Sequence, residues 1–168
     1  AGANQLNTRG YYQRIARTTA LDRSEQSGTP GARNSQAVEN IGPTFASLRH
    51  DPVIPGENQP VTIHADVSDP DGLGDVVLRA RVDGEDTAAT YSFVIGADGH
   101  GQGSVPGQSE GTVVQFWIEA DDALGATSTF PLNGPDARAL FQVEDGRGND
   151  LPAQELRVIM LDADSDFM

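Results

Sequence analysis

Short runs of alternating apolar and polar residues recur between residues 45 and 145, and turn residues separate them. In the clearest run, residues 61–68, every second position is apolar, and these positions are Val61, Ile63, Ala65 and Val67. A period of two places such side chains on one face of a β-strand, where they can be buried together. Pro60 precedes the run, at a position where its missing N–H costs little. The pattern therefore predicts a strand with one buried face.

Comparable runs occur further along the same region, and they cover residues 45–50, 75–84, 86–95, 112–122, 126–132 and 137–145. The glycine-rich stretch 96–111 interrupts the alternation and is predicted to be a loop. No window of the region has the period of about 3.6 residues that marks an amphipathic helix. About seven short strands joined by turns favour an all-β, antiparallel fold with two sheets packed as a sandwich.

The flanks of this region have little periodicity. Residues 1–44 are polar and irregular apart from a short predicted strand at 11–16, and we expect 18–42 to have few backbone partners and high mobility. In residues 146–168 a polar gap precedes the apolar run 154–161, which is predicted to be a strand, and an acidic end follows. Such a strand would open a further domain. The predicted organisation is therefore a linker (1–44), a β-sandwich (45–145) and a second linker with one strand (146–168).

Charge narrows the choice of partners. The chain has 25 acidic and 11 basic residues, all 11 of them arginine, and its formal net charge is -14. Nucleic acids and anionic membrane surfaces would be repelled, so cations and basic proteins are better candidates. A strongly charged surface also serves solubility alone.

Cysteine, membrane and export signals are missing from the sequence. The chain has no cysteine, which excludes disulfides, thiol catalysis and cysteine-ligated metals. No stretch reaches the roughly 20 apolar residues needed to span a bilayer. Residues 1–10 lack the charged and apolar regions of a signal peptide, so an export signal is expected to precede them.

The stretch 66–75, with the sequence DVSDPDGLGD, raises the question of calcium. Aligned on Gly72, it has Val67 and Leu78 where an EF-hand loop needs acidic ligands at its first and last positions. Proline, aspartate and glycine in DPDG suit a β-turn, so a turn explains every residue. The alternative is an irregular calcium site in which two loops meet at one end of the sandwich, with the ligands Asp69, Asp71, Asp75, Asp121 and Asp122.

Catalytic patterns are weak. Glu119 and Asp121 have the spacing of outward-facing strand positions, which favours solvent-exposed side chains over the acid and base of a hydrolase. The histidines His50, His64 and His100 have no metal-ligand spacing, and His100 falls in the predicted glycine loop. Without lysine there is no phosphate-binding loop of the Walker type, and no nucleophile-elbow serine occurs. We therefore expect no enzyme activity in the chain.

Aromatic residues offer one binding alternative. An exposed Trp117, with Tyr91, would form a platform for stacking on a sugar. A tryptophan on a central strand is more often part of the core, so burial is the prediction.

The segments 60–84 and 111–135, with the sequences PVTIHADVSDPDGLGDVVLRARVDG and GTVVQFWIEADDALGATSTFPLNGP, resemble a bacterial immunoglobulin-like (fibronectin-III-like) module. The similarity extends over about residues 43–145, with Phe116 and Trp117 in place of the usual aromatic pair. The segment 11–35 resembles the end of a lamin-tail-type domain. The segment 154–168 is similar to the opening strand of a CotH-type (spore-coat-protein-H-like) kinase domain.

The resemblance implies a non-catalytic spacer or docking module of a secreted or cell-surface bacterial multidomain protein, in contact with neighbouring domains, extracellular proteins or glycans. One alternative is a calcium-ordered module that binds glycan or protein. Another is an accessory segment of a CotH-type kinase-like enzyme whose active site lies outside the chain.

Overall fold

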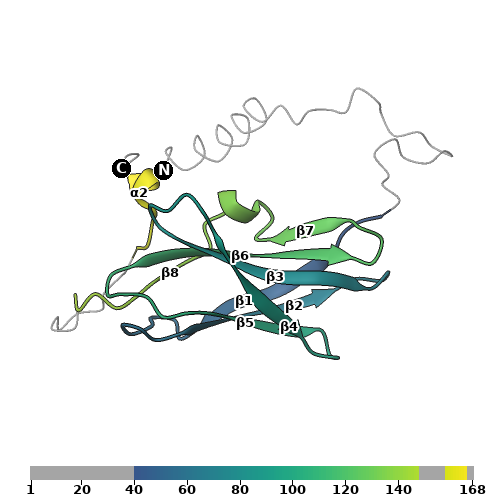
Figure 1. Ribbon diagram of the computed structural model, residues 1–168, viewed down its shortest axis with the longest axis horizontal. Helices are drawn as coiled ribbons and strands as arrows, with labels where there is room; N and C mark the ends of the chain where they lie inside the picture. Colours follow the sequence, from purple (N-terminus) through teal and green to yellow (C-terminus); the bar gives the residue numbers. More distant parts are fainter. Residues whose placement is uncertain (1–39, 148–157, 166–168) are drawn as a thin grey trace, which may run out of the picture. The chain divides into compact units, whose positions relative to one another are not determined.

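The computed structural model describes residues 40–147 and 158–165 (Figure 1). The predicted strand at 11–16, and most of the stretch 18–42 for which high mobility is expected, lie outside these residues. Within the described ranges no helix is long and apolar enough to cross a bilayer.

Eight antiparallel strands make up the described fold, so the predicted all-β antiparallel class is confirmed. They are β1 (Thr44–Asp51), β2 (Val61–Ser68), β3 (Leu73–Val82), β4 (Ala89–Ile95), β5 (His100–Val105), β6 (Val113–Asp122), β7 (Thr127–Phe130) and β8 (Leu140–Gln142). A 3-10 turn, η1 (Gly134–Asp136), connects β7 to β8, and one helical turn, α2 (Asp162–Ser165), lies in the second described range.

Strand β5 corrects one prediction, because it runs through the glycine-rich stretch expected to be a loop. It pairs with β2 on one side and with the end of β4 on the other. A Cβ added to Gly101 would lie 2.2 Å from the Phe93 ring, and one added to Gly103 would lie 2.8 Å from the Ser92 carbonyl. These glycines therefore let an aromatic ring and a neighbouring backbone come close to the strand, which is the role of glycine inside a sheet.

The strands form one strongly curled sheet in the order β1-β2-β5-β4-β3-β6-β7, with β8 pairing β6 beside β7. Strand β4 makes the sheet continuous, because its first half up to Ser92 pairs with β3 while Phe93–Ile95 pairs with β5. The strands β1, β2 and β5 face β3, β6 and β7 across the core (Figure 1). The expected pair of separate sheets is therefore joined through one strand that changes partners.

The core lies inside the curl, and the period-two pattern predicted much of it. All four apolar positions of β2 are buried, as are Leu78 and Ala80 of β3 and Phe93 of β4. Strand β6 contributes its even-numbered positions, Val114, Phe116, Ile118 and Ala120. Strand β8 adds Phe141, whose ring lies 6.1 Å from that of Phe116.

The two edges of the curled sheet approach each other. The ring of Phe45 in β1 stacks on that of Phe130 in β7, with centroids 5.4 Å apart. Strand β1 carries a bulge between Ala46 and Arg49, where Ser47 has a positive φ of 58°. Bulges of this kind keep an edge strand from pairing with other chains.

The chain enters and leaves this fold at opposite ends of β6. Asn40 lies beside Asp122, the last residue of β6, and an added Cβ on Gly42 would come within 3.0 Å of the Thr127 carbonyl carbon. At the other end Gln142 pairs with Val113, the first residue of β6. Ten strand residues at about 3.3 Å each separate the two ends by about 30 Å.

Candidate functional site

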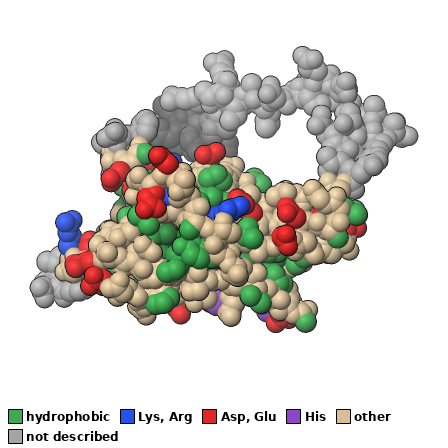
Figure 2. All heavy atoms as spheres, viewed as in Figure 1, with side chains coloured by type: hydrophobic (Ala, Val, Ile, Leu, Met, Phe, Trp, Pro, Cys, Tyr) green, Lys and Arg blue, Asp and Glu red, His purple; other side chains and the backbone are tan. Residues whose placement is uncertain are grey.

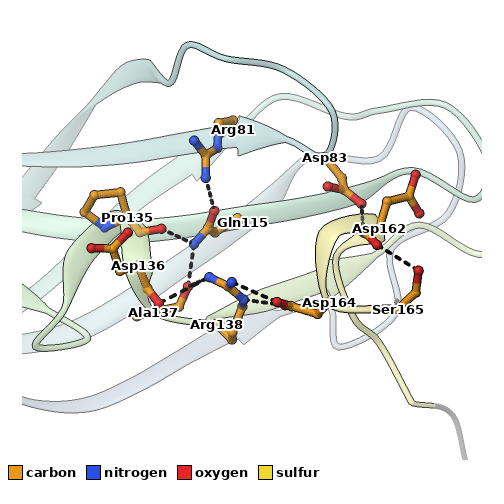
Figure 3. A network of polar contacts seen from close by, with 10 residues as sticks. All are labelled: Arg81, Asp83, Gln115, Pro135, Asp136, Ala137, Arg138, Asp162, Asp164 and Ser165. Carbon is orange, nitrogen blue, oxygen red and sulfur yellow. Dashed lines mark hydrogen bonds and ion pairs between the residues drawn. The ribbon is translucent and has the colours of Figure 1, made fainter. Parts of the chain in front are cut away.

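The outer face of β6 near the exit end is covered, although its side chains point away from the core. Gln115 is only 1% exposed. Its Oε1 accepts a hydrogen bond from Arg81 Nη2 at 2.7 Å, and its Nε2 donates to the carbonyls of Pro135, at 2.7 Å, and of Ala137 (Figure 3). A single amide therefore ties β3, β6 and the η1 turn together.

The η1 turn in turn positions Arg138. The Arg138 guanidinium donates from Nε and Nη2 to the two carboxylate oxygens of Asp164, with Nη2 3.0 Å from Oδ1. Both side chains are partly exposed. The hydrogen bond from Arg138 is the main cause that lowers the pKa of Asp164, and the same bond raises the pKa of Arg138. The two-point contact fixes the orientation of residues near the end of the chain.

Two further contacts hold this C-terminal segment, residues 158–165, on the fold. The backbone N–H of Asp162 donates to Oδ2 of Asp83, which comes directly after β3, at 2.8 Å (Figure 3). Leu161 is 6% exposed, whereas Val158 is 66% exposed. Leu161 and Asp162 line a shallow hollow whose other walls include Arg81, Gln115 and Asp86. The arrangement docks a segment through one apolar residue and a few polar contacts.

The predicted C-terminal strand is not formed in the described part of its range. Residues 158–161 pair with no strand, and the acidic residues after them form α2. Residues 154–157 lie outside the described ranges. The strand prediction is therefore wrong for residues 158–161. Of these four residues only Leu161 is buried, so they do not show the alternation of a strand with one buried face.

The loops of the predicted calcium site do meet at the entry end. Leu73 pairs with Asp122, and the backbone N–H of Ala123 donates to the Gly72 carbonyl at 2.9 Å. The DPDG turn itself is closed by Asp69, whose Oδ1 accepts from the N–H of Asp71 at 2.8 Å and whose carbonyl accepts from Gly72. The turn predicted for this stretch is confirmed.

The five proposed calcium ligands do not point to one place. Asp75 lies on β3, and Asp121 and Asp122 are successive residues of β6, so the last two point to opposite faces. Asp121 accepts a hydrogen bond from Thr127 Oγ1 at 2.6 Å. In residues 40–147 and 158–165 no group of three acidic or histidine side chains is arranged to hold a metal ion. Calcium binding at these residues stays a prediction.

Asp122 has a structural role in the hairpin between β6 and β7. Its Oδ1 accepts hydrogen bonds from the backbone N–H groups of Leu124 and Ala126, both at 2.8 Å. Burial alone would raise the pKa of Asp122, but hydrogen bonds from Ala126, Asn40 and Leu124 outweigh it and lower the pKa. Oδ2 of Asp122 is buried and has no hydrogen-bond partner of normal geometry among the described residues.

Trp117 is buried, as predicted, but it lies on the outer face of β6 and outside the main core. It is 4% exposed, and its Nε1 donates to Glu119 Oε1 at 2.9 Å. Glu119 also accepts from Arg79 Nε at 3.0 Å, across the β3–β6 ladder. Tyr91 packs against the core. The Trp117 ring is therefore closed to stacking on a sugar, Tyr91 is half-buried, and Glu119 is held by structural partners.

The His50 ring on β1 lies beside those of Phe116 and Phe141. His64 on β2 and His100 on β5 lie on neighbouring strands, two residues out of register, and in the described residues the histidines belong to no group that could hold a metal ion.

His100 is on β5 rather than in a loop, and its Nδ1 forms a hydrogen bond with Oδ1 of Asp66 on β2. A hydrogen bond from Ser47, followed by that with His100, lowers the pKa of Asp66, and the pKa of His100 is raised by Asp66. The order serine–aspartate–histidine puts the carboxylate between the other two groups, so it does not form a hydrolytic triad.

Sequence reasoning missed the residues that dock the C-terminal segment: Gln115, Arg138, Leu161 and Asp164. One signal was present, since Gln115 interrupts a nearly apolar strand from Val113 to Ile118. A polar residue in such a run marks a buried polar contact. Nothing local indicated that Arg138 and Asp164 would meet.

No protein-family model matches the chain, and no curated protein shows significant similarity to it.

Proposed function

We propose that the described region is a non-catalytic spacer and docking module of a secreted or cell-surface bacterial multidomain protein. The observation that carries the proposal is the position of its ends. Asn40 and Gln142 lie at opposite ends of β6, so a neighbour on each side would be held about 30 Å apart. A rigid separation of this kind is what a spacer provides.

The strand arrangement also supports resistance to extension. Strand β1 is paired with β2 from Thr44–Ser68 to Asp51–Thr62 except at the bulge between Ala46 and Arg49, and β8 is paired with β6. Because the chain enters before β1 and leaves after β8, tension along the module acts along these strands. Hydrogen bonds of a ladder loaded in this direction must break together rather than one after another.

We further propose that residues 43–145 are an immunoglobulin-like module. Eight antiparallel strands in two facing layers, joined where β4 changes partners, support this assignment along with the motifs in 60–84 and 111–135. The resemblance of residues 154–168 to the start of a CotH-type domain supports a following domain at the exit end. The docked C-terminal segment would then set the place of that domain.

The surface is consistent with an extracellular scaffold. Acidic side chains are spread over the face seen in Figure 2, with few basic ones among them. Such a surface stays soluble and repels nucleic acids and anionic membranes.

Single-molecule pulling tests the spacer proposal. The cysteine-free chain takes two engineered cysteines as handles, Ile41→Cys at the entry end and Arg147→Cys after β8 at the exit end. We expect one abrupt unfolding event at high force. In a matched control with Ile41→Cys and Leu124→Cys, both handles are at the entry end, and unfolding should need less force. Gradual extension between the first pair of handles, or equal forces in both geometries, would contradict the proposal.

A further inference from the structure

The turn between β4 and β5 docks on the end of β2 through backbone and side-chain contacts. The turn is closed by a hydrogen bond from the Gly96 N–H to the His100 carbonyl at 2.8 Å. The Gly99 carbonyl of the turn accepts a hydrogen bond from the Val67 N–H of β2 at 2.9 Å. Next to this bond Asp66 lies opposite His100 in the β2–β5 ladder, and Asp66 Oδ1 forms a hydrogen bond with His100 Nδ1. The side-chain pair therefore lies where the turn meets β2.

His100 is the member of this pair that titrates near neutral pH, and carboxylates flank it. Its side chain is 70% exposed and that of Asp66 is 37% exposed. The hydrogen bond with Asp66 is the main cause that raises the pKa of His100, and the charges of Asp66 and of Asp98 in the turn add to it. Slight burial and Arg49 on β1 act in the opposite direction. Strand β4 carries no charged side chain. The surroundings of His100 thus favour its protonated form.

Asp66 keeps its charge over the whole range in which His100 titrates. A hydrogen bond from Ser47, in the bulge of β1, is the main cause that lowers the pKa of Asp66, and the hydrogen bond with His100 comes second. Protonation of His100 therefore turns a contact between a carboxylate and a neutral ring into an ion pair with a charge-assisted hydrogen bond, which is the stronger of the two.

We propose that His100 and Asp66 form a pH-sensitive clasp, which holds the β4–β5 turn firmly on β2 while His100 is protonated and loosens it when His100 is neutral. A raised histidine pKa contributes stability that is fully present below the unfolded value of about 6.5 and is lost as pH rises through the folded value. The clasp is therefore tightest in mildly acidic solution. It does not depend on the proposed spacer function.

NMR titration of the histidine rings in the full chain tests the charge of the clasp. We expect His100 to titrate above about pH 6.5, and Asp66→Asn should move its titration down toward that value. His64 is an internal control on the neighbouring strand, because burial, followed by the charge of Arg49, lowers its pKa. The proposal is overturned if His100 titrates at or below about pH 6.5, or if Asp66→Asn leaves its titration unchanged.

Hydrogen exchange tests whether the clasp holds the turn. The protection of the Val67 amide, measured relative to the intrinsic exchange rate at each pH, reports on docking because its acceptor is the Gly99 carbonyl. We expect this protection to fall about two- to fivefold as pH rises through the titration of His100, the size expected for an exposed ion pair.

Matched variants separate the clasp from other effects of pH on the fold. His100→Gln and Asp66→Asn should abolish the fall in protection at Val67, whereas His64→Gln should keep it. The amide of Ile118, which lies on β6 between β3 and β7, should show no such step. Protection at Val67 that does not change with pH, a step that survives in His100→Gln, or an equal step at Ile118 would each contradict the clasp.

Discussion

Strand β8 and the C-terminal segment each bring one large apolar side chain to the exit end of β6, but they are held differently. Phe141 in β8 is 1% exposed, lies within 6.1 Å of the Phe116 ring, and is flanked by a ladder that pairs Leu140 and Gln142 with β6. Leu161 is 6% exposed and has no ladder around it. Burial of one side chain thus accompanies two quite different kinds of attachment.

The difference between backbone pairing and side-chain contact explains why β8 belongs to the cooperative fold and the C-terminal segment is attached more weakly. Backbone pairing links β8 to β6, and β6 to β3 and the core, so β8 leaves only when the sheet unfolds. The C-terminal segment depends on side chains that contact one patch. Full burial of a leucine contributes about 2 kcal/mol, and an exposed ion pair adds about 1 kcal/mol or less. Attachment of that size is reversible.

The largest expected loss of stability comes from a change in β8. Phe141→Ala removes a ring from the core between Phe116 and His50, and we expect the free energy of unfolding to fall by about 3–5 kcal/mol. Chemical denaturation followed by far-ultraviolet circular dichroism measures this loss. Leu161→Ala is the matched control and should change the same quantity by much less. Equal losses would show that the two segments are attached in the same way.

Strand β5 gives a second test of the sheet. Gly101→Val puts atoms onto the Phe93 and Ile95 side chains, which an added Cβ would already approach to 2.2 and 2.5 Å. We expect a loss of about 1–3 kcal/mol or more from overpacking. Gly84→Val serves as the comparison, because an added Cβ there meets nothing within 4 Å, although its positive φ adds backbone strain. If Gly101→Val is no more destabilising than Gly84→Val, the close packing of β5 is wrong.

Gln115 links the sheet to the η1 turn, which positions Arg138 for its contact with the C-terminal segment. Gln115→Leu keeps an apolar strand position but leaves Arg81 and the Pro135 and Ala137 carbonyls without the amide. We expect a loss of about 1–2 kcal/mol, together with faster amide exchange in α2, because η1 positions Arg138. Gln142→Leu, on the partly buried neighbouring strand, provides a matched control. Unchanged exchange in α2 would separate the amide from the docking of the segment.

Acid should weaken the C-terminal segment by the smallest amount. Asp164 has a folded pKa below its ordinary value because of Arg138. A depressed carboxyl pKa contributes stability that is present above the unfolded value of about 3.9 and is lost as pH falls through the folded value. The protection of amides in α2, measured relative to the intrinsic exchange rate at each pH, should therefore fall below about pH 4, and Asp164→Asn should remove this dependence. Release between pH 6 and 8 would point to a histidine instead.

Local patterns predicted the strands where the period of two was unbroken, and they failed where tertiary contacts decided. Val61, Ile63, Ala65 and Val67 are all buried on one face of β2, as the alternation indicated. The stretch around Gly101 looked like a loop, because the rings that fill the space beside its glycines come from β4. The apolar run at 154–161 looked like a strand, but its described residues, 158–161, pair with no strand.

The candidate docking site could not be predicted in the same way. Arg138 and Asp164 are 26 residues apart, and Gln115 and Pro135 are 20 apart. Such pairs leave no periodic trace, so only the path of the chain shows that they meet. The acidic turn at Asp69 was predictable because all of its hydrogen bonds are local.

By itself the sequence determined the strands with an unbroken period of two between residues 61 and 122, their apolar faces, the DPDG turn and the strong negative charge, because each of these depends on neighbouring residues. Tertiary structure decided that β4 joins the two layers, that Asp121 and Asp122 serve different faces, and that Leu161 finds a place beside Gln115. These features depend on which distant backbone lies alongside, and that is settled only when the curled sheet has closed around its core.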